Sequence, residues 1–468
     1  MSMDFKSYHT FSMGVRKSRA QLINEVEGLV KAESDIGHRI KPGRLILIEA
    51  THTSEFIALL DYTVKRCASI ALVTKSLQAD DLSLVIERFK PDLLCLRRTR
   101  RLDGLVLSNY TEIVSHGCYA IYIRLKPSYD VNHSLCLLMF TSGSDGSPKA
   151  CKLSIENVTT SINQIIRSLD MDQSDKLLTT LDFAYIYGLS GLLTHMAVGG
   201  EILLNDAPLF TQNFLDRMRQ TRNYNLNLVP IQVEMYLKIH SSIPTTHLPR
   251  FITQAGGKLS GSLIHELARH CSNESLRLYF MYGQTEASPR IAVNPVHKRL
   301  CDLGSVGYIV EGGCITPFED VNDNEIVYHG KNVFCGYANG RGDLLACKSL
   351  ESLSTGDTGK IHPSDGSLFI TGRISRITKV NGLRLNLDFI ELSLQGKFGV
   401  HEKIAVLEES ELLFIICEDT LIDGEEVFSY LRKAFRIPRD RLRFVRYSLI
   451  PRTYRGKLDY RRIREDVR

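Results

Sequence analysis

Short apolar segments alternate with amphipathic ones early in the chain, and this alternation limits the possible fold more than any other feature. Arg44–Ala50 and Ser69–Thr74 are apolar runs of strand length, and Ser54–Cys67 between them has apolar residues at helical spacing. Ser54 stands where the N-cap of that helix is expected. A strand, a helix and a second strand in succession favour parallel strand pairing. The sequence therefore predicts an α/β fold.

The segment Leu137–Ser154, LLMFTSGSDGSPKACKLS, changes from an apolar run to a loop rich in glycine and serine. The run His133–Phe140 predicts a strand, and Ser154–Leu169 predicts a helix that is capped by Ser154 and has Asn157 in its first turn. We therefore expect the loop between a strand and a helix, where α/β proteins often bind ligands. By itself the loop is ambiguous, because GSDGSPK departs from the Walker pattern and an ordinary turn is the alternative.

The composition is that of a soluble globular chain with two or more domains. Of the 468 residues, 43% are hydrophobic and 24% are charged. No apolar run reaches the length of a membrane span, and the N-terminus lacks the apolar stretch of a signal peptide. The 11 cysteines are scattered and form no CxxC pair, which favours reduced thiols in the cytoplasm over disulfides or a zinc site.

The C-terminal end is strongly basic. Residues 432–468 carry 14 Lys or Arg against 4 Asp or Glu. This excess suggests an anionic partner, and a nucleotide, coenzyme A (CoA), an acidic carrier protein and nucleic acid are the alternatives to a merely solvated face. The sequence shows no basic motif interleaved with aromatic residues, so we do not expect nucleic acid as the partner.

Composition shifts near Thr371–Gly382, and a piece of domain size follows. Lys403–Glu408 and Leu412–Cys417 predict strands in it, and Glu425–Phe435 predicts a helix. We therefore expect an N-terminal domain over residues 1–373 and a C-terminal domain over residues 374–468.

Seven motifs follow one another along the chain. The first is the glycine- and serine-rich loop, and the other six lie in the second half of the chain. In chain order they are TSGSDGSPK (141–149), QAGGKLS (254–260), LYFMYGQTEAS (278–288), EIVYHGKNVFCGY (325–337), STGDTGKI (354–361), TGRISRITKVNGLRLNLDFIE (371–391) and PRTYRGKLD (451–459). In kind, order and spacing these motifs resemble those of the AMP-forming adenylating superfamily, which includes acyl-CoA synthetases, peptide-synthetase adenylation domains and luciferase. The ordered set is far more specific than any one motif, while the first 130 residues match only as a loose α/β pattern.

The resemblance implies a large N-terminal domain of stacked α/β layers and a smaller, mobile α+β C-terminal domain. It implies an enzyme that joins a carboxylic acid to ATP, giving an acyl-adenylate and pyrophosphate, and then passes the acyl group to a thiol with release of AMP. The cofactors implied are ATP and Mg²⁺, with CoA or phosphopantetheine as acceptor. Two alternatives remain: transfer to an amine, as in amide formation or amino-acid activation, and an inactive nucleotide-binding relative.

The resemblance also implies roles for single residues. Lys457 would stabilise charge that develops between the carboxylate and the α-phosphate, and Thr285 would bond the α-phosphate. Glu286 would ligate Mg²⁺, a hard cation that prefers oxygen. Asp357 would accept both ribose hydroxyls, and Tyr282 would stack on adenine. The ATP-binding residues implied are Thr141, Ser142, Gly143, Ser144, Gly146, Lys149, Gly256, Gly257, Tyr282, Gly283, Asp357 and Arg373.

Several positions depart from the family pattern. Ser144 and Asp145 replace the usual pair of threonines, and Ala150 replaces a glycine. Asp145 would repel phosphate if it faced the site, and would cost little if it pointed to solvent or bonded a backbone amide. Ser375 stands at the hinge, where no special chemistry is needed. Because the catalytic positions are kept, we expect an active enzyme.

In the family the segment that contains Lys379 and Gly382 swings into the active site for thioester formation. A glycine there leaves room for a slim pantetheine arm. The resemblance therefore favours a thiol acceptor, either CoA or the phosphopantetheine of an acidic acyl carrier protein.

Leu181–Gly191, LDFAYIYGLSG, aligns with the family stretch FHxYG that lines the acid pocket. Ile186 occupies the place where amino-acid-activating relatives have an aspartate that holds the ammonium group. An α-amino acid is therefore disfavoured, although a small alignment gap would bring Asp182 to that place. A small acid of aromatic, hydroxylated or short acyl type remains open. The pocket residues implied are Tyr185, Tyr187, Gln232, Ala255 and Ser288.

Overall fold

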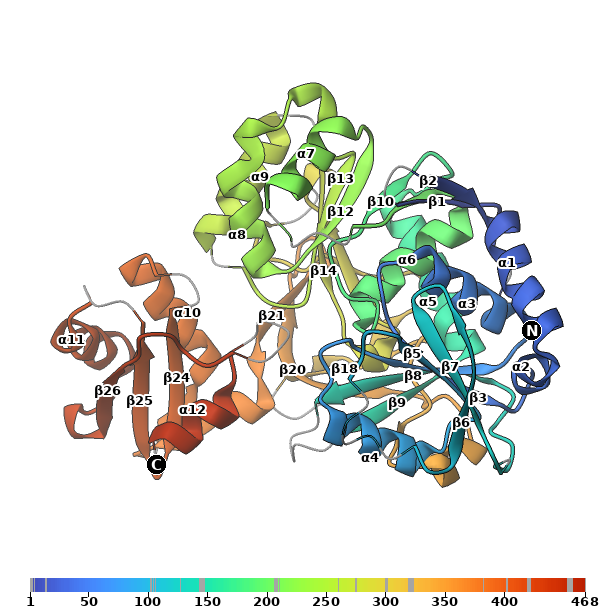
Figure 1. The fold of residues 1–468 in the computed structure, drawn as a ribbon. Coiled ribbons are helices and arrows are strands. Elements are labelled where there is room, and N and C mark those ends of the chain that lie inside the picture. The colour runs from blue at the N-terminus through green and yellow to red at the C-terminus, as the bar shows by residue number, and fades with distance from the viewer. Residues whose placement is uncertain are drawn as a thin grey trace.

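The computed structural model in Figure 1 has its two termini on opposite sides of the molecule. It describes residues 3, 5–12, 15–101, 103, 105, 107–126, 128–142, 148–205, 209, 211–259, 261–273, 276–298, 302–318, 324–381, 383–400, 403–418, 422–452 and 458–467.

An eight-stranded sheet has the strand order β19-β9-β8-β4-β3-β5-β7-β6. Strands β5, β3, β4 and β8 pair in parallel, because helices α3 and α4 carry the chain back between successive strands. The strand–helix alternation predicted from the sequence is thereby confirmed. The elements are β3 (Leu45–Glu49), α3 (Ser54–Lys65), β4 (Ser69–Val73), α4 (Ala79–Phe89), β5 (Leu93–Arg97), β6 (Tyr110–His116), β7 (Tyr119–Arg124), β8 (Leu135–Ser142), β9 (Pro148–Ser154) and β19 (Tyr337–Ala338).

A nine-stranded sheet has the order β16-β15-β14-β13-β12-β10-β11-β1-β2 and is parallel from β1 to β14. Its strands are β1 (His9–Ser12), β2 (Val15–Ser18), β10 (Lys176–Leu178), β11 (Glu201–Leu203), β12 (Tyr224–Leu228), β13 (Phe251–Gln254), β14 (Arg277–Tyr282), β15 (Ala292–Pro295) and β16 (Tyr308–Ile309). The helices beside it are α1 (Arg19–Ala32), α2 (Ser34–Arg39), α5 (Ile155–Leu169), α6 (Ile186–Val198), α7 (Gln212–Gln220), α8 (Pro230–Ile239) and α9 (Gly261–Asn273).

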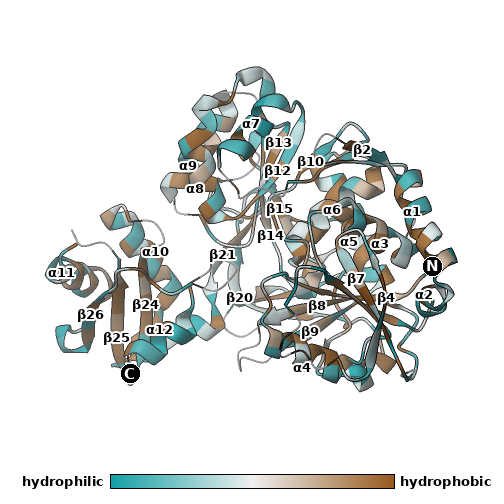
Figure 2. Cartoon of the chain, in the orientation of Figure 1, coloured by the Kyte–Doolittle hydropathy of each residue, from teal (hydrophilic) through white to brown (hydrophobic). Residues whose placement is uncertain are grey.

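The two sheets share one apolar core. This core joins Ile46 of β3 and Tyr279 of β14 through Phe56 of α3 and Leu192 of α6, so helices lie between the sheets. Helix α4 packs on the outer face of the first sheet, and α7, α8 and α9 pack on the outer face of the second. Figure 2 shows apolar residues concentrated on the inner strands and on the covered faces of these helices. The prediction of stacked α/β layers is confirmed.

Two local predictions were wrong. The N-cap of α3 is Thr53, whose hydroxyl accepts from the Phe56 amide, and Ser54 is already helical. The glycine- and serine-rich loop does not lie between a strand and a helix, because β9 follows it and pairs antiparallel with β8. Helix α5 begins only after β9, where Ser154 caps it as predicted and Asn157 completes a capping box.

A four-stranded antiparallel sheet, β17-β18-β20-β21, leads to the last part of the chain. Its strands are β17 (Cys314–Ile315), β18 (Glu325–His329), β20 (Leu353–Ile361) and β21 (Leu368–Arg373). The C-terminal elements are β22 (Ile377–Val380), β23 (Leu383–Asn386), α10 (Leu387–Phe398), β24 (Ile404–Glu409), β25 (Leu412–Cys417), α11 (Gly424–Phe435), β26 (Leu442–Arg446) and α12 (Tyr460–Val467). They form a separate body in Figure 1, and their apolar clusters contain only residues from this part of the chain.

Candidate active site

Three predicted nucleotide-binding residues form one hydrogen-bonded network. Tyr282 at the end of β14 donates its phenol to Asp357 Oδ2 at 2.8 Å, and Arg373 Nε donates to Asp357 Oδ1 at 2.9 Å. The Asp357 side chain is only 8% exposed, whereas that of Arg373 is 60% exposed. Burial and the adjacent Asp357 carboxylate raise the pKa of Tyr282, so its phenol stays a donor. Each Asp357 oxygen has a second lone pair that can accept a hydroxyl group.

Glu286 lies in a short 3-10 turn, Thr285–Ala287, just after β14. Tyr337 donates its phenol to Glu286 Oε1 at 2.8 Å, and the Cys151 thiol lies 3.6 Å from the same oxygen. Tyr337 belongs to β19, which pairs with β9 at Cys151. Glu286 is therefore held against the strand that leaves the predicted phosphate loop.

The Glu286 carboxylate suits a magnesium ion, which prefers oxygen ligands and is usually held by one or two carboxylates together with substrate phosphates. Within the described part of the chain, no three His, Cys, Asp or Glu side chains converge as a ready metal cage. A single carboxylate beside a phosphate loop is the arrangement that such a shared site requires.

Only the two ends of the predicted phosphate loop are described. Thr141 and Lys149 face each other in the β8–β9 pairing, and the Thr141 hydroxyl donates to the Lys149 carbonyl at 3.4 Å. The predicted residues that lie outside the described residues are Gly143, Ser144, Asp145, Gly146, Gly382 and Lys457, together with the side chain of Ser142.

Two glycines of the predicted adenine region are required by close contacts. Gly256 has a φ of +85°, and a Cβ there would lie 2.8 Å from the Tyr185 hydroxyl. A Cβ on Gly283 would overlap the Pro289 carbonyl oxygen. The predicted adenine stretch therefore touches Tyr185, which was predicted from a different motif.

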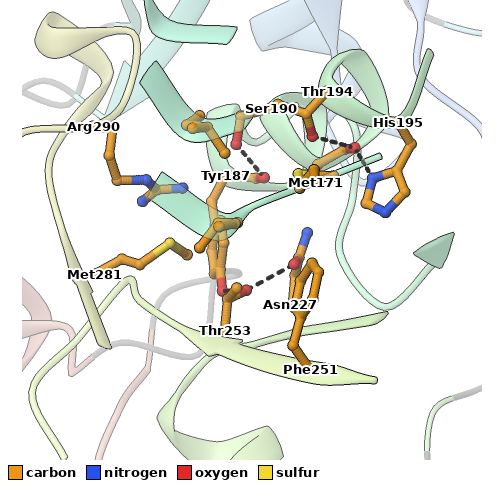
Figure 3. A pocket seen from close by; sticks show the side chains of 13 residues that line it. Met171, Tyr187, Ser190, Thr194, His195, Asn227, Phe251, Thr253, Met281 and Arg290 are labelled. Atoms are coloured by element: carbon orange, nitrogen blue, oxygen red, sulfur yellow. Dashed lines mark hydrogen bonds between the residues drawn. The ribbon is translucent and has the colours of Figure 1, made fainter. Parts of the chain in front are cut away.

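A small cavity of about 10 Å³ lies between α5 and α6 and strands β12 to β14 (Figure 3). Of the five predicted pocket residues, Tyr187 lines this cavity and the other four do not. The Tyr187 hydroxyl is 2.7 Å from the Thr253 hydroxyl, which donates to Asn227 Oδ1 at 2.7 Å. The cavity wall therefore mixes apolar side chains with polar ones, which come from α6, β12, β13 and Arg290.

The other predicted pocket residues have local partners or lie nearby. Tyr185 packs edge-on against Tyr187, with ring centroids 6.3 Å apart. The Gln232 amide accepts from the Val229 amide and donates to the Thr180 carbonyl, both at 3.1 Å, so it fixes the start of α8. Ala255 and Ser288 are buried, and the Ser288 hydroxyl has no partner among the described residues.

Asp182 also has local partners. Its carboxylate accepts from the Thr74 hydroxyl at 2.5 Å and from the Ala184 amide at 2.8 Å. These bonds fix the turn that precedes α6, and Asp182 is absent from the residues that line the cavity.

The structure adds residues that the sequence did not single out. Arg290, four positions after Glu286, lines the cavity and is 2% exposed. Asn157 also does more than cap α5, because its Nδ2 donates to the carbonyls of Lys331 and Val333 at 2.7 Å. Neither role has a local signal, since both depend on segments that meet only in the folded chain.

Ser375 lies between two anchored arginines. Arg373 is bound to Asp357, as described above, and Arg376 donates to Asp388 at 2.7 Å and to Glu391 at 2.9 Å, both on α10. Ser375 itself is exposed, and Lys379 is exposed on β22. The predicted hinge is therefore the short stretch between an anchor on the four-stranded sheet and an anchor on the C-terminal body.

Stacked α/β layers followed by a smaller C-terminal body are the fold of adenylate-forming ligases. The chain belongs to the AMP-binding enzyme family, whose profile matches residues 49–338. The predicted family membership is confirmed.

Similar proteins agree with this assignment. The oxalate–CoA ligase of Arabidopsis thaliana is 25% identical, over 92% of this chain and 89% of its own. The D-alanine–D-alanyl carrier protein ligase of Staphylococcus haemolyticus is 22% identical, over 99% and 98%. The structure of O-succinylbenzoate coenzyme A synthetase from Bacillus subtilis, in complex with ATP and magnesium ion, is 18% identical with a TM-score of 0.75, over 97% of this chain and 95% of that one.

The expected class of reaction, AMP-forming activation of an acid followed by transfer to a thiol, is supported by the family and by the names of these ligases. No helix in the described residues is long and apolar enough to cross a membrane.

Proposed function

We propose that this chain activates a small carboxylic acid with ATP and Mg²⁺ and passes the acyl group to the thiol of CoA. The observation that carries the proposal is the Tyr282–Asp357–Arg373 network, which leaves a buried carboxylate with free lone pairs beside a phosphate-loop strand. Glu286 and the cavity lined by Tyr187 lie next to it along the same segment.

In this proposal Asp357 accepts the ribose hydroxyls, and Tyr282 and the Gly256–Gly257 backbone hold adenine. Glu286 holds Mg²⁺, which neutralises phosphate charge when bound. Thr285 donates to the α-phosphate, and Lys457 stabilises the charge that develops during attack by the carboxylate. The further ATP-binding residues proposed are Thr141, Ser142, Gly143, Ser144, Gly146, Lys149, Gly283 and Arg373.

We also propose that residues 374–468 move as one domain about Ser375. Their separate apolar core and the arginine anchors on both sides of Ser375 support this assignment. Lys379 and Gly382 would then reach the thiol in the second step.

CoA is the acceptor that the oxalate–CoA relative favours. A carrier-protein thiol is the second candidate, because the D-alanyl carrier protein ligase aligns with nearly the whole chain. The basic C-terminal end, residues 432–468, suits either anionic partner. All ten described cysteines are free thiols, which supports a reducing compartment such as the cytoplasm.

The test is pyrophosphate release from Mg·ATP with a panel of acids, repeated with CoA, with a phosphopantetheinyl carrier protein and with amines as acceptors. Lys457→Ala should abolish acid-dependent release, whereas Lys397→Ala, at an exposed lysine on α10, should leave it unchanged. If no acid supports pyrophosphate release by the unmutated protein, the protein is an inactive nucleotide-binding relative. Product formed only with amines would contradict thiol transfer.

A further inference from the structure

Arg290 is a buried cation without a counter-charge. Its side chain is 2% exposed, and Nε is fully enclosed with no hydrogen-bond partner among the described residues. Within the same residues, no carboxylate forms an ion pair with it. Burying a guanidinium without an anion is strongly unfavourable, which calls for a reason specific to this site.

Arg290 faces the cavity rather than solvent. Its guanidinium carbon lies 5.4 Å from the centroid of the Tyr187 ring, and Figure 3 shows the side chain reaching toward Tyr187 above Met281. An aromatic face attracts a cation, but far less than a carboxylate does. Among the described residues that line the cavity, the one other basic group is His195, whose pKa is lowered by burial, so it is neutral near pH 7.

The cavity wall contains no carboxylate among the described residues that line it. Asp182, the nearest acid in the aligned motif, has its carboxylate bound to Thr74 and Ala184. The cavity therefore repels a second positive charge and attracts a negative one. This arrangement disfavours an α-amino acid and favours an acid with a second anionic group.

Arg290 is rigidly connected to the reaction centre. It follows Glu286 by four residues, and Asn332 Nδ2 donates to the carbonyls of Ala287 at 2.7 Å and of Arg290 at 2.8 Å. These two bonds fix the backbone between Glu286 and Arg290. The backbone from which the Arg290 side chain extends is therefore fixed relative to Glu286.

We propose that Arg290 binds a second carboxylate, at the end of the acid substrate remote from the carboxylate that is activated. The preferred substrate is then a compact dicarboxylic acid, and this inference rests on the proposed function. A guanidinium pairs with a carboxylate through two parallel hydrogen bonds, a geometry that a neutral amide does not satisfy. The cavity has room for only about 10 Å³, close to one water molecule, which favours a short acid.

The test compares matched acids on the full chain. Oxalate, malonate, succinate and glutarate are each measured against their monoamides in Mg·ATP-dependent pyrophosphate release. We expect at least one dicarboxylate to exceed its monoamide by roughly 10- to 100-fold in kcat/KM. Equal kcat/KM values within every pair would overturn the inference.

Variants of Arg290 test whether this residue causes the preference for dicarboxylates over monoamides. Arg290→Met should remove it, by lowering the rate with the dicarboxylate and raising it with the monoamide, and Arg290→Lys should retain part of it. Arg167→Met is the matched control, because Arg167 is an exposed arginine, with 64% of its side chain accessible, that pairs with Glu311 on the surface. A dicarboxylate preference that survives in Arg290→Met would contradict the proposal.

Two further measurements separate this inference from the proposed function. Removing an unpaired buried charge should raise the unfolding temperature of the ligand-free protein, so a lower value for Arg290→Met than for the unmutated chain would count against it. If no acid releases pyrophosphate, calorimetric titration with the four dicarboxylates still decides the matter. Binding that Arg290→Met abolishes supports the site without the activity, and binding that is absent or unchanged in Arg290→Met rejects it.

Discussion

Tyr282 and Asp357 are joined by a 2.8 Å hydrogen bond between the nine-stranded sheet and the four-stranded sheet. We expect Asp357→Asn to raise the KM for ATP by about 10- to 100-fold, because the amide loses charged acceptors for the ribose hydroxyls. Tyr282→Phe keeps the ring and frees one lone pair of Asp357, so its KM should change by less than about 10-fold. Steady-state pyrophosphate release at varied ATP measures both. The reverse order of effects would contradict the assignment of Asp357 to ribose.

Tyr337 is expected to orient Glu286 for magnesium. Glu286→Gln should raise the Mg²⁺ concentration needed for half-maximal activity, because an amide is a weaker ligand than a carboxylate. Tyr337→Phe keeps the charge and removes only the 2.8 Å hydrogen bond, so its Mg²⁺ requirement should rise much less. Magnesium titrations at saturating ATP compare the two variants, and an unchanged requirement in Glu286→Gln would exclude a ligand role.

Asn157 is expected to contribute strongly to stability. Asn157→Ala leaves the buried carbonyls of Lys331 and Val333 without their donor and breaks the capping box of α5. The free energy of unfolding should fall by about 2–4 kcal/mol. Glu156→Ala, next to it on the exposed side of α5, should change it by less than about 0.5 kcal/mol. Urea denaturation measures both values, and equal losses would show that the bonds of Asn157 add nothing.

The lowered pKa of His270 predicts that the free energy of unfolding depends on pH. Burial and the neighbouring His240 lower the pKa of His270 to about 4, and its Nε2 lies 3.1 Å from the Tyr236 hydroxyl. Because the unfolded chain binds this proton near pH 6.5 and the folded chain near pH 4, stability should fall as the pH drops through that range. The loss is about 3 kcal/mol at most, and solvent screening at the half-buried ring reduces it to about 2 kcal/mol. Unfolding of His270→Gln at pH 7 and pH 4.5 should show a smaller difference than the unmutated chain, and an identical difference would refute this.

The layered fold could be predicted because its signals are local. Strands β3 and β4 are apolar runs, and the segment between them has apolar residues at helical spacing. The spacing of apolar residues therefore indicates each element directly. Strand β9 was not predicted, and its residue Lys152 has contacts that the local sequence does not contain. Its ammonium is buried, since it donates to the carbonyls of Asp343 and Ala346, which lie about 190 residues later. No local pattern contains that contact.

Some residues of the candidate site could likewise be predicted from local motifs, whereas others depend on contacts that form only in the folded chain. Tyr282, Asp357 and Arg373 were predicted from separate motifs. The β20–β21 pairing places Arg373 opposite Asp357, and Tyr282 reaches Asp357 from the other sheet. The contact of Tyr337 with Glu286 depends on the pairing of β19 with β9, and the burial of Arg290 depends on the whole cavity wall. The sequence around an arginine does not indicate whether its side chain will be exposed. The sequence therefore does not predict that Arg290 lines the cavity.

The two anchored arginines limit how the C-terminal body can be displaced. Only Ile374 and Ser375 separate Arg373 on the four-stranded sheet from Arg376, which is ion-paired to Asp388 and Glu391 on α10. Three Cα–Cα steps reach at most about 11 Å, so while both ion pairs hold, the two bodies cannot translate far from each other. Any large change in their mutual orientation is then a rotation about a nearly fixed pivot. If the C-terminal body rotates as proposed, a different face of it turns toward the four-stranded sheet while the pivot near Ser375 stays in place.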